Sequence, residues 1–238
     1  MSETIAAATP ALDQLAGGTS RTLRITEIFR SLQGESDHIG WPTVFVRLTG
    51  CPLRCVYCDT AYAFTGGERM SQDAILSRVA ELGTRHVCVT GGEPLAQPGC
   101  PELLRQLADA GHVVSLETSG AMDIAAVDPR VHVVMDLKTP SSGEVGRNRW
   151  ENLAHLKTGD KIKAGDEIKV VIGSREDFDW AIDRVREHDL TGRFTVLFSP
   201  VFEGVAPRTL AEWILDSGLA IRFQMQLHKL IWGDEPGR

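Results

Sequence analysis

Short apolar runs alternate with amphipathic segments from residue 43 onward, and this alternation restricts the fold more than any other feature of the sequence. Each run is nearly continuous in apolar residues, which is typical of strands that are buried on both faces of a parallel sheet. The expected strands are residues 43–48, 86–90, 112–117, 131–137, 167–172 and 194–199. The expected helices are residues 71–82, 101–110, 149–157, 175–188 and 207–216.

This pattern predicts an α/β fold of the partial-barrel kind. Strands joined by helices favour a parallel, right-handed (βα)6 array, because the expected strands are too few for a closed barrel, which needs about eight. Residues 22–30 are expected to add an N-terminal strand and residues 221–227 a C-terminal strand. The chain of 238 residues suffices for a single domain over residues 21–238, and residues 1–20 are expected to form a loose tail.

The composition argues against several kinds of partner. A formal net charge of −7 is unsuited to nucleic acid or an anionic membrane, since both attract basic surfaces. No apolar run approaches the roughly 20 residues that cross a bilayer. The N-terminus lacks the basic and apolar segments of a signal peptide. We therefore expect a cytoplasmic protein with no nucleic-acid or membrane partner.

Three of the five cysteines lie together, directly after the expected strand at 43–48. Cys51, Cys55 and Cys58 have the spacing C-x3-C-x2-C, so three thiolates can hold three irons of a cubane cluster and leave the fourth iron open. A zinc site would need a fourth ligand at compatible spacing, and the nearest histidine, His38, precedes the loop. The spacing therefore favours an iron–sulfur cluster over zinc.

The remaining cysteines do not suggest disulfides. A secreted disulfide framework would spread an even number of cysteines through a shorter chain. Cys88 lies inside an apolar run and is expected to be a core residue. Cys100 is expected to be an idle thiol in a loop.

Other polar residues follow the next expected strands at their carboxyl ends. Residues 90–94 read Thr-Gly-Gly-Glu-Pro, residues 117–120 read Glu-Thr-Ser-Gly, and residues 136–138 read Asp-Leu-Lys. In parallel α/β sheets the chemistry gathers at this edge. We therefore expect these residues and the cysteine loop to form one site.

The cysteine spacing together with Gly91-Gly92-Glu93-Pro94 resembles the radical S-adenosylmethionine (SAM) superfamily. The resemblance implies a [4Fe–4S] cluster held by Cys51, Cys55 and Cys58, with SAM on the open iron. An electron from the cluster would then split SAM and release a 5′-deoxyadenosyl radical.

The same resemblance assigns residues to SAM. Tyr57 would pack against the adenine, or alternatively wall the cluster off from solvent. Glu93 would accept a hydrogen bond from the SAM amino group, or alternatively brace its own loop. The full set of SAM-binding residues would be Tyr57, Cys58, Asp59, Gly92, Glu93, Glu117, Ser119 and Lys138.

A second group of motifs narrows the resemblance to one family. The motifs are Ser31-Leu32-Gln33-Gly34-Glu35, Arg47, Asp59-Thr60, Gln226-Leu227-His228-Lys229 and Trp232-Gly233. From about residue 22 to its end, the chain resembles the 7-carboxy-7-deazaguanine synthase family. This family contracts the ring of 6-carboxy-5,6,7,8-tetrahydropterin to 7-carboxy-7-deazaguanine and expels ammonia, for queuosine and related 7-deazapurines. It uses SAM catalytically and requires Mg²⁺.

The family resemblance implies a substrate site. Its residues would be Leu32, Gln33, Gly34, Glu35, Arg47, Thr90, His228 and Pro236, with Glu35, Arg47 and His228 as the catalytic ones. Arg47 would pair with the substrate carboxylate, because its planar fork suits two oxygens. Thr60 would place its hydroxyl oxygen on Mg²⁺, which prefers oxygen ligands. His228 and Pro236 would close the pocket.

Structural alternatives stay open for some of these residues. Glu35 and Arg47 would form a purely structural pair, Thr60 would cap the helix after the cysteine loop, or His228 would be a satisfied histidine at a strand end.

The sequence departs from the family pattern in two places. Pro52 stands where the family commonly has Asn, and Ser36-Asp37 replaces the usual Gly after Glu35. Neither change removes an expected ligand, but the second bears on the shape of the loop at the pterin site.

Two rival functions remain, one within the radical SAM enzymes and one in another class of protein. Another small radical SAM enzyme, such as a glycyl-radical activase, would act on a protein, and the Ser-Leu-Gln-Gly-Glu motif weighs against it. A non-catalytic iron–sulfur or zinc module would have no use for the Gly-Gly-Glu-Pro motif. The favoured resemblance also implies an electron donor such as a flavodoxin, and a homodimer.

Overall fold

The computed structural model describes residues 22–159, 165–233, 235 and 237, so the expected tail at 1–20 lies outside the described residues. The strands of the described part form one 9-stranded open sheet in the order β3-β1-β2-β4-β5-β6-β7-β8-β9. They are β1 (Thr22–Leu32), β2 (Pro42–Leu48), β3 (Glu68–Ser71), β4 (His86–Gly91), β5 (Val113–Thr118), β6 (His132–Leu137), β7 (Glu167–Ile172), β8 (Thr195–Pro200) and β9 (Ile221–Phe223). Neighbours from β2 to β9 pair in parallel, whereas β1 is antiparallel to both β2 and β3.

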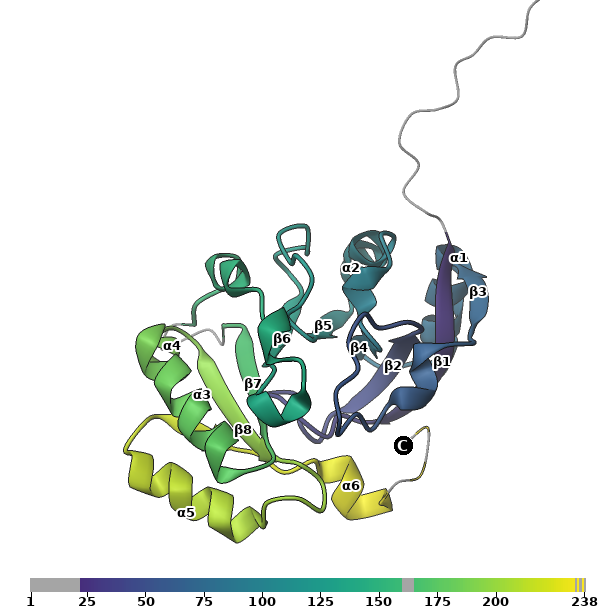
Figure 1. The fold of residues 1–238 in the computed structure, drawn as a ribbon. Coiled ribbons are helices and arrows are strands. Elements are labelled where there is room, and N and C mark those ends of the chain that lie inside the picture. The colour runs from purple at the N-terminus through teal and green to yellow at the C-terminus, as the bar shows by residue number, and fades with distance from the viewer. Residues whose placement is uncertain (1–21, 160–164, 234, 236, 238) are drawn as a thin grey trace, which may run out of the picture.

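The predicted partial barrel is confirmed. Each of the six expected strands is present, and their ends differ from the prediction by at most one residue. Figure 1 shows the sheet curving, with the longer helices around its outside. These are α1 (Gln72–Leu82), α2 (Cys100–Asp109), α3 (Arg175–Glu187) and α5 (Pro207–Ser217), and the short ones are α4 (Leu190–Arg193) and α6 (Leu227–Trp232). Within the described part of the chain, no helix is long and apolar enough to cross a membrane.

The helix expected at residues 149–157 is wrong. Only a 3-10 segment, Trp150–Ala154, forms there. The fully buried side chain of Asn152 donates to the carbonyl oxygens of Gly120, at 3.1 Å, and Met122, at 2.8 Å. Bonds to a distant loop therefore override the local preference for a helix.

Two further expectations are corrected. The C-terminal strand ends at Phe223 rather than at residue 227, because the backbone leaves β9 to form α6. Cys100 is the first residue of α2 and is fully buried with Leu103 and Leu104, so it is a core residue rather than a loop thiol.

In the loop between β1 and β2, Ser36 adopts a backbone conformation that glycine usually adopts. Ser36, at one of the departures from the family pattern, has φ +67°, in the left-handed region that favours glycine. The buried side chain of Gln224 supports it from the far end of the sheet. Its Oε1 accepts from the Ser36 N–H at 2.8 Å, and its Nε2 donates to the Ser36 carbonyl at 3.2 Å. The loop thus keeps its shape through a contact that links the two ends of the sheet.

Helix α6 also joins those two ends. Figure 1 shows it between the β8 side and the β1–β2 side of the sheet. The backbone N–H of Leu227 donates to the carbonyl of Gly34 at 3.0 Å. A Cβ atom at Gly34 would come within 2.1 Å of Nδ1 of His228, so only glycine fits there. This contact places His228 against the loop that carries the Gln33-Gly34-Glu35 motif.

Gln224→Leu should lower the free energy of unfolding by about 1–3 kcal/mol, because it leaves the buried amide and carbonyl of Ser36 without partners. Urea unfolding of the wild type and the variant measures the change. Gln106→Leu is the matched control, since the Gln106 amide bonds only to Glu102 of its own helix. Equal stability of the Gln224 variant and the wild type would contradict the linking role.

Candidate active site

Polar side chains face the inside of the curved sheet, near the carboxyl ends of five parallel strands. They are Arg47 on β2, Thr90 on β4, Glu117 on β5, Asp136 on β6 and Lys169 on β7. All of them line one of two adjoining cavities, which we call the cysteine cavity and the β1-loop cavity. The cavities share the residues Asp59, Thr60, Thr90, Gly91, Glu117, Lys169, Gln226 and Lys229. The expected gathering of the site at the strand ends is therefore present.

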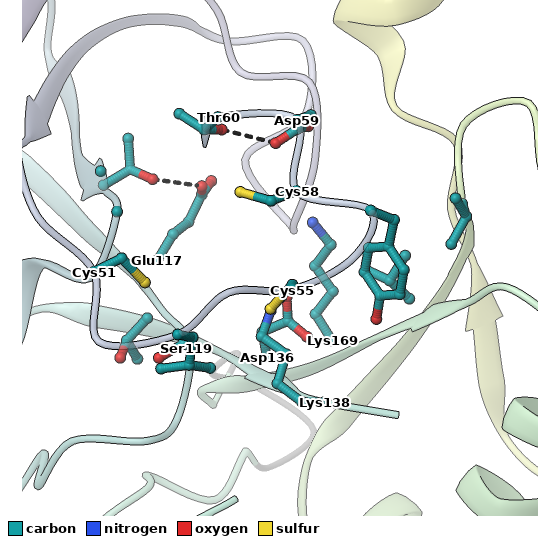
Figure 2. Close-up of a pocket in the computed structure, with 18 of the residues that line it drawn as sticks. Cys51, Cys55, Cys58, Asp59, Thr60, Glu117, Ser119, Asp136, Lys138 and Lys169 are labelled. Carbon is teal, nitrogen blue, oxygen red and sulfur yellow. Dashed lines mark hydrogen bonds and ion pairs between the residues drawn. The ribbon is translucent and has the colours of Figure 1, made fainter. Parts of the chain in front are cut away.

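The cysteine cavity has a volume of about 450 Å³, which is in the usual range for a small-molecule site. Cys51, Cys55 and Cys58 all line it, and all three are unpaired and partly buried. Figure 2 shows their side chains around one space, together with Glu117, Ser119, Asp136, Lys138 and Lys169.

The three thiols fit the ligand set of a cubane cluster. Each thiolate of a cubane binds its own iron, so its ligands need only surround a common space, as these three do. Burial raises the pKa of all three thiols, so they would release protons on binding iron.

Backbone hydrogen bonds hold the Gly-Gly-Glu-Pro loop against the cysteine loop. The N–H of Gly92 donates to the Leu48 carbonyl at 3.1 Å, and the N–H of Glu93 donates to the Gly50 carbonyl at 2.8 Å. A Cβ atom at Gly92 would lie 2.3 Å from the Gly50 oxygen and 2.8 Å from Cβ of Cys51. Glycine is therefore required for this close approach.

Glu93 adopts the bracing alternative. Its carboxylate is fully buried and accepts hydrogen bonds from the Ser119 N–H at 2.7 Å, the Thr118 hydroxyl at 3.0 Å and the Leu95 N–H at 2.9 Å. The side chain does not line the cysteine cavity. Glu93 thus joins the ends of β4 and β5, and its expected contact with SAM stays a prediction.

Tyr57 and Lys138 also line the cysteine cavity. The Tyr57 hydroxyl lies 3.2 Å from the Thr139 hydroxyl, and burial raises the pKa of Tyr57 to about 12. Burial opposes the charge of Lys138, but the carboxylate of Asp136, 2.8 Å away, together with Cys55 and Tyr57, raises the pKa of Lys138. The other oxygen of Asp136 is buried without a partner among the described residues, as expected of a group that awaits a ligand.

The β1-loop cavity is smaller, about 200 Å³, and brings together most of the expected substrate-binding residues. It is lined by Leu32, Gln33, Gly34, Glu35, Arg47, Thr90 and His228. Pro236 lies outside the described residues. The rings of Phe29 and Phe45, which also line this cavity, stack at a centroid distance of 5.1 Å.

The purely structural pair between Glu35 and Arg47, which the sequence left open, does not form. Arg47 Nε donates to Glu27 Oε1 at 2.7 Å, and Lys169 donates to Glu35. Glu117 was assigned to SAM, yet its two oxygens accept from Gln33, at 3.2 Å, and Thr90, at 3.1 Å, so it stands between the two cavities.

Thr60 does not cap a helix with its side chain, and His228 does not lie at a strand end, so neither structural alternative for these residues holds. Thr60 precedes a 3-10 segment, Ala61–Phe64, but its hydroxyl makes no capping bond and donates instead to Asp59 Oδ1 at 2.7 Å. His228 lies on α6 and not at a strand end, and burial lowers its pKa.

Sequence reasoning missed Lys169 and Glu27. Lys169 lies between the apolar residues Ile168 and Val170 in β7, and a cation in such a run signals a polar site, so it could have been found. Glu27 lies on β1, where polar residues are ordinary. Its role as the partner of Arg47 follows only from the antiparallel register of β1 and β2.

A match to a known superfamily agrees with this geometry. A model of the Radical SAM superfamily matches residues 45–216. The chain belongs to that superfamily, which implies a [4Fe–4S] cluster and SAM as its cofactors.

Individual relatives define the family more closely. A 7-carboxy-7-deazaguanine synthase from Chlorobaculum tepidum is 44% identical over 218 residues, covering 91% of this chain and 97% of the relative. Another, from Koribacter versatilis, is 41% identical over 228 residues, covering 90% and 98%. The crystal structure of QueE from Escherichia coli shares the fold, with a TM-score of 0.71 at 24% identity, covering 87% of this chain and 95% of that one. The chain belongs to the 7-carboxy-7-deazaguanine synthase family.

Gly92→Ala should lower the iron and sulfide bound per chain after anaerobic reconstitution, because the new methyl group pushes the cysteine loop away. Gly146→Ala is the control, since a Cβ there meets no atom within 4 Å. Iron and sulfide assays on the two variants give the comparison. Full cluster content in the Gly92 variant would refute the tight packing of the two loops.

Proposed function

We propose that this protein contracts the ring of 6-carboxy-5,6,7,8-tetrahydropterin to 7-carboxy-7-deazaguanine with loss of ammonia, a step toward queuosine and other 7-deazapurines. The names of its relatives support this activity. The observation that carries it is the border of the two cavities, because the thiol-lined cavity shares eight lining residues with the small polar one. A cofactor and a compact polar substrate can therefore lie in contact there.

In this proposal Cys51, Cys55 and Cys58 hold the cluster, and SAM fills the rest of the cysteine cavity. The bound cluster and SAM together supply the radical that starts the reaction. The unpartnered oxygen of Asp136 accepts a hydrogen bond from SAM, and Tyr57 covers the adenine. The backbone of Gly92 allows the close approach of the SAM amino group, while Glu93 keeps the loop rigid.

The β1-loop cavity binds the pterin in the same proposal. Among the described residues, only Nε of Arg47 is hydrogen-bonded, so its two Nη groups remain for the substrate carboxylate. Gln33 and Glu35 face the pyrimidine edge. Burial lowers the pKa of His228, which keeps its imidazole neutral and able to accept a proton from the substrate.

Mg²⁺ is part of the proposal as well. The hydroxyl of Thr60 and the carboxylate of Asp59 lie at the border of the two cavities and offer hard oxygen ligands. Although burial opposes it, the bond from Thr60 and the nearby charge of Lys169 lower the pKa of Asp59. Thr60 and Asp59 would hold the ion there, and its positive charge would attract the oxygens of the substrate.

We further propose an external electron donor such as a flavodoxin, assembly as a homodimer, and one domain over residues 21–238. Val56, between two of the cluster cysteines, is 80% exposed and gives a donor access to the loop.

Trp41, Leu230 and Ile231 are exposed apolar residues suited to the interface of a homodimer. A cytoplasmic location fits five unpaired cysteines, since thiols persist in a reducing compartment.

Reconstituted enzyme with SAM, dithionite, Mg²⁺ and carboxytetrahydropterin should release 7-carboxy-7-deazaguanine, identified by its mass. Cys51→Ala, Cys55→Ala and Cys58→Ala should each abolish the product, because no neutral side chain replaces a thiolate on iron. Cys88→Ala is the control, since Cys88 is a buried core residue. An active variant among the first three would refute the cluster assignment, and a wild type without product would refute the function.

Thr60→Ala should raise the Mg²⁺ concentration for half-maximal rate on the order of tenfold, since the ion loses a protein ligand. Thr60→Ser should behave as the wild type because it keeps the oxygen. Initial rates against Mg²⁺ concentration, with a melting curve for each protein, provide the test. An Ala variant with an unchanged Mg²⁺ dependence would remove Thr60 from the metal site.

A further inference from the structure

Lys169 is a buried cation that lines both cavities, although no motif assigned it a role. It lies on β7 opposite Asp136 of β6, and its side chain is only 15% exposed. Figure 2 shows it directed into the cysteine cavity, toward the loop that carries Cys58 and Asp59. A lysine this deeply buried is unfavourable unless an anion compensates it.

Glu35 is the anion that compensates Lys169, and only one of its two carboxylate oxygens takes part in the ion pair. Lys169 donates to Glu35 Oε2. The other oxygen, Oε1, is buried and has no hydrogen-bond partner among the described residues. The Glu35 carboxylate lines the β1-loop cavity, with Gln226 and His228 beside it. One oxygen is thus anchored, and the other is left as an acceptor in the cavity.

We propose that Lys169 is a positioning residue that holds Glu35 as a charged acceptor for the 2-amino edge of a pterin. The proposal rests on the proposed function and adds the group that sets its specificity. The pyrimidine edge of a pterin carries adjacent N–H donors, which match a carboxylate oxygen. Without Lys169, Glu35 would be a buried carboxyl without a cation, which favours the protonated form and a free rotamer.

The surrounding charges agree with this assignment. Burial opposes the charge of Glu35, but the charge and hydrogen bond of Lys169, together with a hydrogen bond from Gln226, lower the pKa of Glu35. Burial likewise opposes the charge of Lys169, whose pKa is raised by Glu35, Asp136 and Glu117. Lys169 is the largest of the influences that keep Glu35 ionised, and a hydrogen bond from the Gln226 side chain adds a smaller one.

Binding of two ligands to the holoenzyme tests the proposal. The ligands are carboxytetrahydropterin and its 2-oxo analogue, which lacks the amino group. Equilibrium dialysis is done anaerobically with the cluster and SAM present but no reductant, so no turnover occurs. The wild type should prefer the amino compound, and Lys169→Met should weaken its binding about 10- to 100-fold while changing the analogue little. Lys169→Arg should retain most of the preference.

A double-mutant cycle separates positioning from direct contact. In a Glu35→Gln background, Lys169→Met should cost little more, because its effect acts through Glu35. This double variant removes both charges of the pair, so it should fold even if a single variant does not. Lys157→Met is the control, since it breaks a 3.0 Å bridge to the buried Asp166 away from both cavities.

Several results of these binding measurements would overturn the proposal. An unchanged preference in Lys169→Met, or equal weakening of both ligands, overturns the proposal while the proposed function stands. A full additional loss in the Glu35→Gln background also overturns it and assigns Lys169 to direct contact. A wild type that binds neither ligand overturns the proposed function and the proposal together.

Discussion

Charges inside the curved sheet must be paired, and this constraint organises the site. An unpaired charge in such a place costs several kcal/mol, whereas a paired one can be retained for function. Arg47 pairs with Glu27, Lys169 with Glu35, and Lys138 with Asp136. In the last two pairs one carboxylate oxygen has no partner among the described residues, Oδ1 of Asp136 in one cavity and Oε1 of Glu35 in the other. The charges are thus stable without a ligand and still present acceptors to one.

The sheet topology brings these pairs together from distant parts of the chain. Glu35 belongs to the loop between β1 and β2, whereas Lys169 belongs to β7. The loop reaches β7 because Gln224 and α6 bind its backbone at Ser36 and Gly34. The β1-loop cavity therefore depends on contacts that close the open sheet at one end, and not on the parallel strands alone.

The parallel strands and the cysteine loop could be predicted from the sequence because their signals are local. Strands such as β4 and β7 are nearly continuous apolar runs. A charged residue inside such a run, as Arg47 is in β2, signals a polar site. The 3-10 segment at Trp150–Ala154 could not be predicted, since it depends on bonds from Asn152 to Gly120 and Met122. Likewise the partners of Glu35 and Arg47 depend on register and loop closure, so the structural pair between them that the sequence left open as an alternative does not form.

In the proposed function, SAM in the cysteine cavity and the pterin in the β1-loop cavity lie in direct contact. This contact can be measured with substrate that is deuterated on the carbons of its reduced ring and turned over with SAM. Because the cavities share a border and SAM would be regenerated in each turnover, deuterium should pass from the substrate into SAM recovered after turnover. Formation of 7-carboxy-7-deazaguanine with no deuterium in SAM or in 5′-deoxyadenosine would contradict it.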